Sequence, residues 1–487
     1  MPTPQPGRFP AASSPRPVVI VGGGITALAA AYRLQTEAQG QPLAITVLEQ
    51  TERLGGKIRT EQRDGFTLEL GPDIFLARKP RGIELCREVG LETQIRDTNR
   101  VQRGSYIQKK DALYRLPEGL SGLIPTRLGP MLRTPLLSPW GKLRLATDWL
   151  RPARRDEADE SVAAFITRRL GREAYVNLVE PLLGGIYGGD GNALSLQATL
   201  PQLRALERRY GSLVRGLLKE QAARSEEASA QSAFVTLEGG METLITRLAA
   251  QLPGVDIRLS RPVRAINRLG VGYAVHTDAA PPLRADAVLV TTPAHRAAGL
   301  LAPLDGGLAD ELGAIPHGST ITLSMAFRAA DVPHPLDAYG YIIPRAEGKP
   351  VLACTWSSTK IPGRAPDGMV LLRLFLGRSD ADAVFQQDEE ALVAMARAEL
   401  QTMLGITAWP LFHRLHRWHR AMPQYVLGHS ERLTRIAQRL AVHPGLFLAG
   451  AAYRGVGIPD CILDGERAAE QAAAFLAATE VASVPES

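Results

Sequence analysis

Cysteine is scarce in this chain, which argues against two kinds of structural feature. The 487 residues include only Cys86, Cys354 and Cys461, and no two of these lie at the spacing of a paired motif. We therefore expect neither a disulfide framework nor a cysteine-based zinc site, and the sequence fits a reducing compartment such as the cytoplasm.

Long apolar runs are also missing. No segment reaches the roughly 18 uninterrupted apolar residues of a membrane-spanning helix, so no span is expected, while peripheral contact with a membrane stays open. Residues 1–17 are rich in Pro and Ser and lack the charged-then-apolar pattern of a secretory signal. We expect them to form a disordered tail.

The net charge of the chain is positive, but its sequence contains no nucleic-acid-binding motif and no Lys-rich run. The net charge is +6, and residues 101–155 carry eleven Lys or Arg against three acidic residues. A basic balance of this kind suits a solvated surface, an anionic substrate or an anionic membrane, and the sequence leaves these open. It predicts no nucleic-acid partner and gives no sign of the oligomeric state.

A βαβ unit opens the chain. Residues 18–21 form a short β-branched run typical of a buried parallel strand, residues 25–38 have a helical texture, and residues 44–48 predict the next strand. Further strands are predicted over 286–292, 320–325, 338–343, 351–356, 369–376 and 446–449, and a last helix from Pro459. Residues 184–191 suggest a glycine loop, and residues 223–232 a linker.

The turn between the first strand and helix carries the dinucleotide fingerprint Gly22-x-Gly24-x-x-Ala27. The first glycine allows a tight turn, the second lets the backbone approach a pyrophosphate, and the small third residue lets helix and strand pack. The helix N-terminus offers free N–H groups to the anion. Glu49 ends the second strand, where a carboxylate can accept the hydroxyls of an adenosine ribose.

The segment that follows resembles the amine oxidase superfamily of flavoproteins. It reads Glu49-Gln50-Thr51-Glu52-Arg53-Leu54-Gly55-Gly56-Lys57, and Leu237-Glu238-Gly239-Gly240-Met241 resembles a later turn of the same superfamily. This resemblance implies FAD rather than NAD as the cofactor.

A narrower resemblance covers nearly the whole chain, from Val18 to about Ala477. The chain is similar to the protoporphyrinogen/coproporphyrinogen oxidases of haem biosynthesis, and most closely to the bacterial coproporphyrinogen III oxidases. Four segments carry this resemblance: Gly71-Pro72-Asp73-Ile74-Phe75-Leu76-Ala77-Arg78-Lys79, Gly184-Gly185-Ile186-Tyr187-Gly188-Gly189-Asp190, Arg417-Trp418-His419-Arg420-Ala421-Met422-Pro423-Gln424-Tyr425 and Gly455-Val456-Gly457-Ile458-Pro459-Asp460-Cys461-Ile462.

The resemblance implies a set of FAD contacts and names no catalytic side chain. The contacts are Gly22, Gly23, Gly24, Ile25, Thr26, Ala27, Glu49, Gln50, Gly56, Lys57, Gly71, Pro72, Asp73, Ile74, Val263, Trp418, Val456, Gly457 and Ile458. Ile74 stands where relatives often have serine, so a side-chain hydrogen bond is lost there. Covalent relatives carry a cysteine within 417–425, and this chain has none, which implies non-covalent FAD. For the substrate the resemblance suggests Arg103, Gly185 and Tyr187.

The fold class we expect is α/β plus α+β. A Rossmann-type FAD-binding domain is expected from residues 18–90, 233–303 and 430–480. A helical region near the active site or facing a membrane is expected over 91–215, and an antiparallel-sheet substrate domain over 304–429.

The implied reaction is the six-electron oxidation of a porphyrinogen, with dioxygen as acceptor and hydrogen peroxide as product. The basic stretch and the missing membrane span favour coproporphyrinogen III, with four carboxylates, over protoporphyrinogen IX. An amine oxidase, a carotenoid desaturase or a non-catalytic Rab GDP-dissociation inhibitor would share the fold. Val456 aligns with one member of the amine oxidases' aromatic cage, which makes that cage incomplete here.

Three histidines invite a metal interpretation that the pattern does not favour. His413, His416 and His419 recur every three residues within a predicted strand, where this spacing divides them between two faces. We expect no metal. Asp460, near the start of the last helix, is expected to serve as a helix-start carboxylate.

Overall fold

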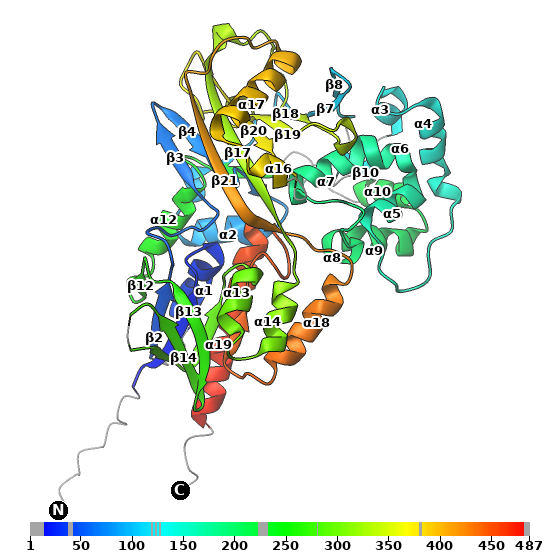
Figure 1. The fold of residues 1–487 in the computed structure, drawn as a ribbon. Coiled ribbons are helices and arrows are strands. Elements are labelled where there is room, and N and C mark those ends of the chain that lie inside the picture. Colours follow the sequence, from blue (N-terminus) through cyan, green and yellow to red (C-terminus); the bar gives the residue numbers. More distant parts are fainter. Residues whose placement is uncertain are drawn as a thin grey trace, which may run out of the picture.

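The structure, a computed structural model, describes residues 14–37, 42–117, 120–121, 124–125, 128–222, 232–279, 281–378 and 382–481. Figure 1 shows an elongated body with a parallel sheet and its helices at the lower end, a large sheet above them, and a group of helices to one side. None of the described helices has both the length and the apolar character that crossing a bilayer requires.

The lower body is built on a five-stranded sheet in which all neighbours are parallel. Its order is β12-β2-β1-β16-β22. The strands are β1 (Arg16–Val21), β2 (Leu43–Leu48), β12 (Asp256–Arg258), β16 (Ala287–Val290) and β22 (Leu446–Leu448). The sheet therefore joins segments from the beginning, the middle and the end of the chain.

Helices and small sheets cover both faces of this parallel sheet. Val18 and Ile20 of β1 pack on one face with α1 (Ile25–Glu37), α12 (Glu242–Ala250) and α19 (Ile458–Val481). Val19 and Val21 pack on the other face, as the alternation of a strand requires. That face is covered by α13 (Ala294–Leu301), α14 (Gly306–Gly313), α18 (His429–Leu440), β13 (Val263–Leu269), β14 (Gly272–Thr277) and β15 (Leu283–Ala285).

Short strands connect the lower body to the upper one. The hairpin β3 (Thr60–Arg63) and β4 (Phe66–Glu69) follows the second glycine segment, and β11 (Phe234–Leu237) pairs with β5 (Phe75–Leu76) and β6 (Ile95–Asp97). Helix α2 (Pro80–Glu88) follows β5. A further two-stranded sheet consists of β9 (Leu120–Ser121) and β10 (Ile124–Pro125).

The upper body is a seven-stranded sheet in the order β21-β17-β20-β19-β18-β7-β8. Its strands are β21 (Phe412–Pro423), β17 (His317–Arg328), β20 (Met369–Leu376), β19 (Val351–Trp356), β18 (Gly340–Ile342), β7 (Tyr106–Lys109) and β8 (Ala112–Arg115). Only the β18/β7 pair is parallel. Helix α17 (Glu389–Leu404) packs its apolar side on this sheet, and α15 (Ser357–Lys360) and α16 (Asp382–Phe385) are short.

Residues 91–215, predicted to be mostly helical, also contain strands. β6 pairs with β11, and β7 and β8 extend the large sheet. The sequence missed β7 and β8 because each has only four residues and one is an exposed edge. The helices are α3 (Leu128–Arg133), α4 (Pro139–Ala146), α5 (Val162–Leu170), α6 (Arg172–Ala174), α7 (Glu180–Tyr187), α8 (Leu196–Thr199), α9 (Pro201–Tyr210) and α10 (Leu213–Ala222).

The glycine loop predicted over 184–191 is wrong in its first half. Gly184 to Tyr187 continue α7, which follows a π-helical turn over Tyr175–Val179, and Gly188 ends the helix with a left-handed φ of 63°. Leu182, Leu183 and Tyr187 contact the apolar core of the helical region, and this packing outweighs the low helix propensity of the two glycines.

The predicted fold class is confirmed, including the parallel sheet and the antiparallel one. Residues 1–13 and 223–231, where most of the tail and of the linker were predicted, lie outside the described residues. Strand β1 already includes Arg16 and Pro17, so the predicted tail was drawn two residues too long.

Candidate functional site

The turn between β1 and α1 leaves room in front of the helix. Gly22 has a φ of 111°, and a Cβ there would lie 2.7 Å from the Thr291 hydroxyl, so this position requires glycine. A Cβ on Gly24 would meet no protein atom within 4 Å. Gly24 is therefore not needed for packing, and its open side adjoins the N-terminus of α1, where an anion is favoured.

The helix that follows is closely packed. Thr26 and Ala27 are buried, and a Cβ on Gly465 of α19 would lie 2.3 Å from the carbonyl of Thr26. Ile25 and Ile458 contribute to the same core. The small third position of the fingerprint thus serves the contact between α1 and α19.

Glu49 links the fingerprint to the second strand. Its Oε2 accepts a hydrogen bond of 2.7 Å from the Gly23 backbone N–H, and its Oε1 accepts from the backbone N–H and the hydroxyl of Thr51. The carboxylate is buried, and Gln50 beside it is exposed. Oε2 accepts only this one hydrogen bond and keeps lone-pair capacity for a further donor, so the ribose contact predicted for Glu49 stays a prediction.

The second glycine segment lies directly on the fingerprint. The Gly55 N–H donates to the Gly23 carbonyl over 2.8 Å, and a Cβ on Gly56 would lie 3.3 Å from the Gly24 Cα. Lys57 follows, partly buried, and its Nζ donates to the carbonyl of Ala421 in β21. Burial lowers the pKa of Lys57. An ammonium in this position can serve an anion that enters the crevice.

The Gly71 loop is fixed through backbone carbonyls. A Cβ on Gly71 would lie 1.8 Å from the Lys57 carbonyl, so the two segments touch. The Leu70 carbonyl accepts from Trp418 Nε1 at 2.7 Å and from the Thr322 hydroxyl at 3.0 Å. Trp418, predicted to contact FAD, therefore also holds this loop, in which Pro72 and Ile74 are partly buried.

Five buried or mostly buried ionic side chains lie behind this loop, and of these the sequence pointed only to Asp73. Lys360 Nζ lies 2.7 Å from the Asp73 carboxylate, and Arg364 lies 3.0 Å from the Glu69 carboxylate. Arg373 donates to the carbonyls of Leu70 and Gly71. These five side chains, Glu69, Asp73, Lys360, Arg364 and Arg373, are called the loop cluster below.

The pKa values in the loop cluster reflect burial opposed by charge. Burial raises the pKa of Glu69 despite its contact with Arg364. Burial also opposes ionisation of Asp73, but Lys360 and Arg373 outweigh it and lower the pKa of that carboxyl. Burial lowers the pKa of Arg373. A single arginine within the apolar strand 369–376 was the signal in the sequence, since a charge rarely enters such a run unpaired.

The C-terminal glycine segment lies against three other elements. Gly455 has a φ of 140°, and its N–H donates to the Tyr425 hydroxyl over 2.8 Å. Asp460 accepts from the Gly457 N–H over 3.2 Å, which confirms its role at the helix start, and it pairs with Lys79 at 2.6 Å. Val456 packs against the core of the helical region.

The structure does not gather all the residues suggested for substrate binding in one place. Tyr187 belongs to the helical core that Val456 contacts, and its hydroxyl donates to the Thr199 carbonyl. A Cβ on Gly185 would meet nothing within 4 Å, which leaves that side of α7 open. Arg103 is exposed on the loop before β7, and its guanidinium has no hydrogen bond or ion pair within the described ranges. Val263 packs at the other face of the parallel sheet.

The basic stretch 101–155 is in part structural. Arg144 donates to the carbonyls of Thr167, Arg168 and Arg169, and Arg154 pairs with Asp156. Arg115 pairs with Asp337. The excess of charge in this stretch is therefore weaker evidence for an anionic substrate than the sequence suggests.

The three spaced histidines have separate partners. His413 lies 3.1 Å from Glu389, His416 contacts the Trp418 ring, and His419 lies beside Phe385. In the part of the chain that the structure describes, no group of three His, Cys, Asp or Glu side chains could hold a metal ion.

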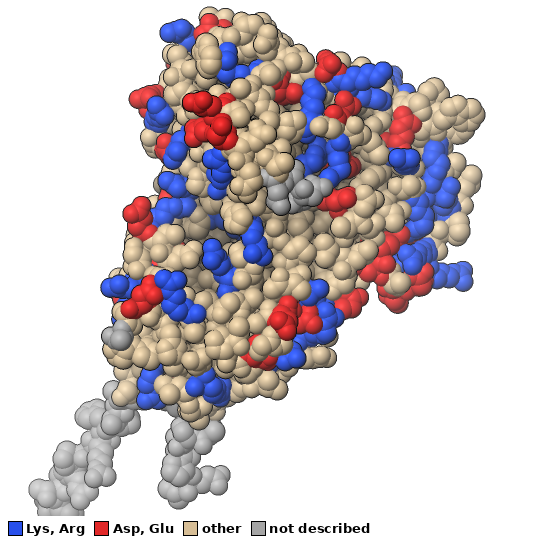
Figure 2. Space-filling model, viewed as in Figure 1, with Lys and Arg blue, Asp and Glu red and all other residues tan. Residues whose placement is uncertain are grey.

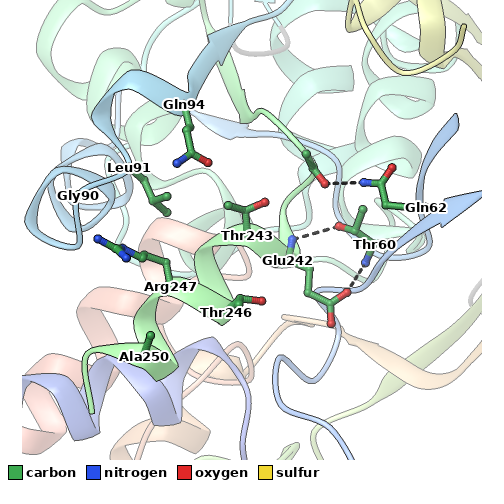
Figure 3. Close-up of a pocket in the computed structure, with 11 residues that line it drawn as sticks. Thr60, Gln62, Gly90, Leu91, Gln94, Glu242, Thr243, Thr246, Arg247 and Ala250 are labelled. Atoms are coloured by element: carbon green, nitrogen blue, oxygen red, sulfur yellow. Dashed lines mark hydrogen bonds between the residues drawn. The ribbon is translucent and has the colours of Figure 1, made fainter. Parts of the chain in front are cut away.

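An open depression of about 570 Å³ lies beside α12, away from the predicted site residues. Its polar groups already bind one another, as Figure 3 shows: Thr60 and Glu242 exchange hydrogen bonds, and Gln62 donates to the Gly239 carbonyl. Arg247 donates to the carbonyl of Val89. We assign no chemistry to this depression.

The residues present fit a dinucleotide with a flavin half. The fingerprint, the Gly55-Gly56 segment, Lys57 and the Gly71 loop touch one another, and the open side of Gly24 leaves space for a diphosphate at a helix N-terminus. This is the carboxyl edge of parallel strands, where ligands bind in open α/β sheets.

Comparison with known proteins agrees with this geometry. Residues 26–473 match the family of flavin containing amine oxidoreductases. The coproporphyrinogen III oxidase of Bacillus subtilis is 36% identical over 94% of this chain and 98% of its own length, and that of Staphylococcus aureus is 35% identical over 94% and 99%. The protoporphyrinogen oxidase of Homo sapiens is 30% identical over 93% and 98%.

Solved structures show the same fold. A crystal structure of an Exiguobacterium sp. 255-15 protein assigned as a protoporphyrinogen oxidase has a TM-score of 0.84 and 36% identity, covering 95% of this chain and 99% of that one. Reduced UDP-galactopyranose mutase has a TM-score of 0.69 at 17% identity, covering 94% and 95%, and shows the fold alone.

Proposed function

Since the chain belongs to the flavin-containing amine oxidoreductases, and within them to the porphyrinogen oxidases, we propose that it oxidises coproporphyrinogen III to coproporphyrin III in haem biosynthesis. It is an FAD-dependent oxidoreductase. The single observation that carries the substrate is the similarity over nearly the full length of both chains to bacterial coproporphyrinogen III oxidases, at 35–36% identity.

Bound FAD would supply the redox chemistry, taking two electrons at a time from a porphyrinogen that loses six, with dioxygen as the final acceptor. The chain's own residues hold and shield the reactants. The N-terminus of α1 and Lys57 would bind the diphosphate, Glu49 the ribose, and the Gly71 loop with Trp418 and residues 456–458 the flavin half. The loop cluster fixes the position of the Gly71 loop through the Leu70 and Gly71 carbonyls.

The tetrapyrrole would lie where the flavin half meets the helical region. Val456 joins these parts, because it precedes α19 and packs on the helical core that includes Tyr187. The open side of Gly185 and the exposed Arg103 stay proposed contacts, the second for a propionate. A cytoplasmic location is part of the proposal, and the free, buried Cys86, Cys354 and Cys461 support it, because such cysteines are common in proteins of reducing compartments.

A second candidate substrate is protoporphyrinogen IX, because two mammalian protoporphyrinogen oxidases are 30–31% identical over 93% of this chain and 98% of their own length. The two substrates differ at two ring positions, where propionates replace vinyl groups. A pocket built for four carboxylates loses charge-assisted pairs when two of them become apolar. A pocket built for vinyls would have to bury two additional charges.

The test is a comparison of kcat/KM for both porphyrinogens at one ionic strength, since electrostatic steering depends on salt. We expect a preference of about tenfold or more for coproporphyrinogen III, by the usual 1.4 kcal/mol for one lost charge-assisted contact. An equal or higher value for protoporphyrinogen IX would overturn the substrate while leaving the flavin chemistry intact.

A further inference from the structure

A group of basic side chains beside the nucleotide crevice has no role in the site described so far. The rings of His295 and His317 meet edge to face with centroids 4.7 Å apart. Both histidines lie within electrostatic reach of Arg420 and Lys57. His295 belongs to the first turn of α13, His317 begins β17, and Arg420 lies near the end of β21.

The topology places this group at the carboxyl edge of the parallel sheet. His295 follows β16 by a few residues, and the Thr291 side chain in between lies against Gly22 of the fingerprint. Lys57 follows Gly56, which lies against Gly24. Figure 2 shows basic side chains, with no acidic ones among them, in the band between the lower end of β21 and α13.

Strand β21 has a bulge at Arg420, one of the basic residues of this group. Pairing with β17 runs from Thr320↔Trp418 to Gly318↔Met422, so Ser319 faces the three residues between Trp418 and Met422. Arg420 has a φ of 45°, and its N–H donates to the Ser319 hydroxyl over 3.0 Å. A non-glycine residue in this conformation costs about 1 kcal/mol or more, and such strain gathers at functional sites. The side chain that the bulge presents is exposed.

The charges around the two histidines are of one sign. Burial lowers the pKa of His295 to about 4, and His317, Arg420, Arg296 and Lys57 act in the same direction. Burial likewise lowers the pKa of His317 to about 4, opposed by its hydrogen bond to the Ile315 carbonyl and supported by Lys57 and Arg420. Among the described groups with the largest effects on either ring there is no carboxylate.

Two buried polar atoms in the turn that leads into α13 lack hydrogen-bond partners in the described part of the chain. Nδ1 of His295 and the Thr292 hydroxyl are buried and have no hydrogen-bond partner among the described residues. Buried polar atoms are nearly always paired, so an unpaired pair in one turn indicates a partner that is not part of the chain. The positive charges nearby favour an anion as this partner.

We propose that His295, His317 and Arg420 form, together with Lys57, a subsite for the diphosphate of FAD, and that binding of FAD is accompanied by proton uptake at this histidine pair. The proposal rests on the FAD dependence of the protein and not on the identity of its substrate. A diphosphate next to the rings favours their charged form, so it raises their pKa from the value of about 4 in the free site.

The sign of the resulting pH dependence follows from linkage. Because the histidine pKa is higher with FAD bound, the gain in FAD affinity is fully present below the free-state pKa of about 4 and is lost as the pH rises through the bound-state pKa. The diphosphate itself stays ionised throughout this range, so the histidines and Lys57 are the groups that can titrate. The effect of Lys57 would appear at higher pH, since its unperturbed pKa of 10.5 is lowered by burial.

The experiment uses the holoenzyme. FAD release on dilution is followed by the recovery of flavin fluorescence between about pH 6 and 8, and ³¹P NMR of the bound cofactor is recorded over the same range. The variants are Arg420→Gln, Arg420→Lys and the double variant His295→Gln/His317→Gln. Arg296→Gln is the matched control, because it removes an equal charge from an exposed position next to His295.

We expect Arg420→Gln to weaken FAD binding by roughly tenfold, the usual effect of one charge-assisted contact, and Arg420→Lys to weaken it less. The wild-type dissociation constant should rise severalfold from pH 6 to pH 8, and the double-histidine variant should lose this slope together with the ³¹P titration. Circular dichroism identifies a variant that misfolds. The pH dependence of the wild-type FAD dissociation constant and the wild-type ³¹P titration test proton uptake without any variant.

Three outcomes would overturn the proposal. One is FAD binding by the wild-type protein that does not change with pH. Another is a loss in Arg296→Gln equal to that in Arg420→Gln. The third is unchanged FAD binding in Arg420→Gln with a raised KM for the porphyrinogen, which would assign the group to a substrate carboxylate instead. None of these results depends on which porphyrinogen the enzyme prefers.

Discussion

Two buried arginines show how differently the helical region and the cofactor crevice are built. Arg169, in the helical region, is fully buried, and its three nitrogens donate to the Asp148 carboxylate and to the carbonyls of Asp148, Arg151, Pro152 and Gly211. Arg373, behind the Gly71 loop, donates to two carbonyls, but its Nε has no partner among the described residues.

The difference extends to the carboxylates around them. Asp148 also accepts from the Ser212 hydroxyl and the Val214 N–H, so the Arg169 site is complete within the protein. In the loop cluster, Nε of Arg364 is unpaired as well within the part described. A polar site that satisfies all its own donors and acceptors stabilises the fold, whereas one with unused donors has capacity for a further partner, such as water or a ligand group.

The largest effect that separates the two regions is expected for Gly24→Val. A Cβ there meets no protein atom, so the fold should survive, while a branched side chain blocks the approach of a diphosphate to the backbone N–H groups. We expect complete loss of the flavin spectrum from a protein with an unchanged circular dichroism spectrum. Gly299→Val in α13, where a Cβ also meets nothing, is the control and should keep its FAD. A folded Gly24→Val protein with full flavin would show that the crevice is misassigned.

The next effect concerns the closed site. Arg169→Met leaves Asp148 and Glu207 buried without their shared cation and should lower the free energy of unfolding by about 3–5 kcal/mol. Chemical denaturation followed by circular dichroism measures it. Arg208→Met removes an exposed pair with Glu157 and a long hydrogen bond to the Asp156 carbonyl, and should change the stability by less than about 1 kcal/mol. If both substitutions lower the free energy of unfolding equally, the buried Arg169 site does not stabilise the fold more than an exposed ion pair does.

Arg373→Met should have a smaller effect on stability and a measurable effect on the cofactor. It removes the hydrogen bonds to the Leu70 and Gly71 carbonyls, at about 1–3 kcal/mol, and we expect FAD to dissociate roughly tenfold more readily. Arg373→Lys keeps the charge but cannot reproduce the planar fork of donors, so it should restore the binding only in part. Wild-type FAD release from a destabilised Arg373→Met protein would mean that the loop cluster serves the fold alone.

Much of the fold could be predicted because it follows from local pattern. The apolar runs 351–356 and 369–376 became strands with the predicted bounds, and residues 18–21 became the centre of the parallel sheet. The glycine loop could not be predicted correctly, since α7 continues through Gly184 and Gly185 only by packing on the helical core. Strand β7 pairs with the distant strand β18, and β8 pairs in turn with β7, so neither could be predicted from its local sequence.

In the candidate site, too, some residues could be predicted from local sequence patterns, whereas others are brought together only by the tertiary fold. The glycine segments and Glu49 were visible because their spacing between strand and helix carries the geometry. The loop cluster was visible only as one arginine in an apolar strand, since its members are contributed by three separate segments, 69–73, 360–364 and β20. The grouping of His295, His317 and Arg420 depends on a bulge between β17 and β21, which no local pattern of residues announces.

The central claim is that this protein oxidises a porphyrinogen with bound, non-covalent FAD. The most direct measurement mixes the yellow holoenzyme with coproporphyrinogen III under strict exclusion of oxygen and follows the visible flavin absorbance. The account predicts that the flavin colour bleaches on mixing, that admitted air restores it as porphyrin fluorescence appears, and that acid precipitation releases the flavin into the supernatant. A flavin that stays oxidised in the presence of both coproporphyrinogen III and protoporphyrinogen IX would contradict it.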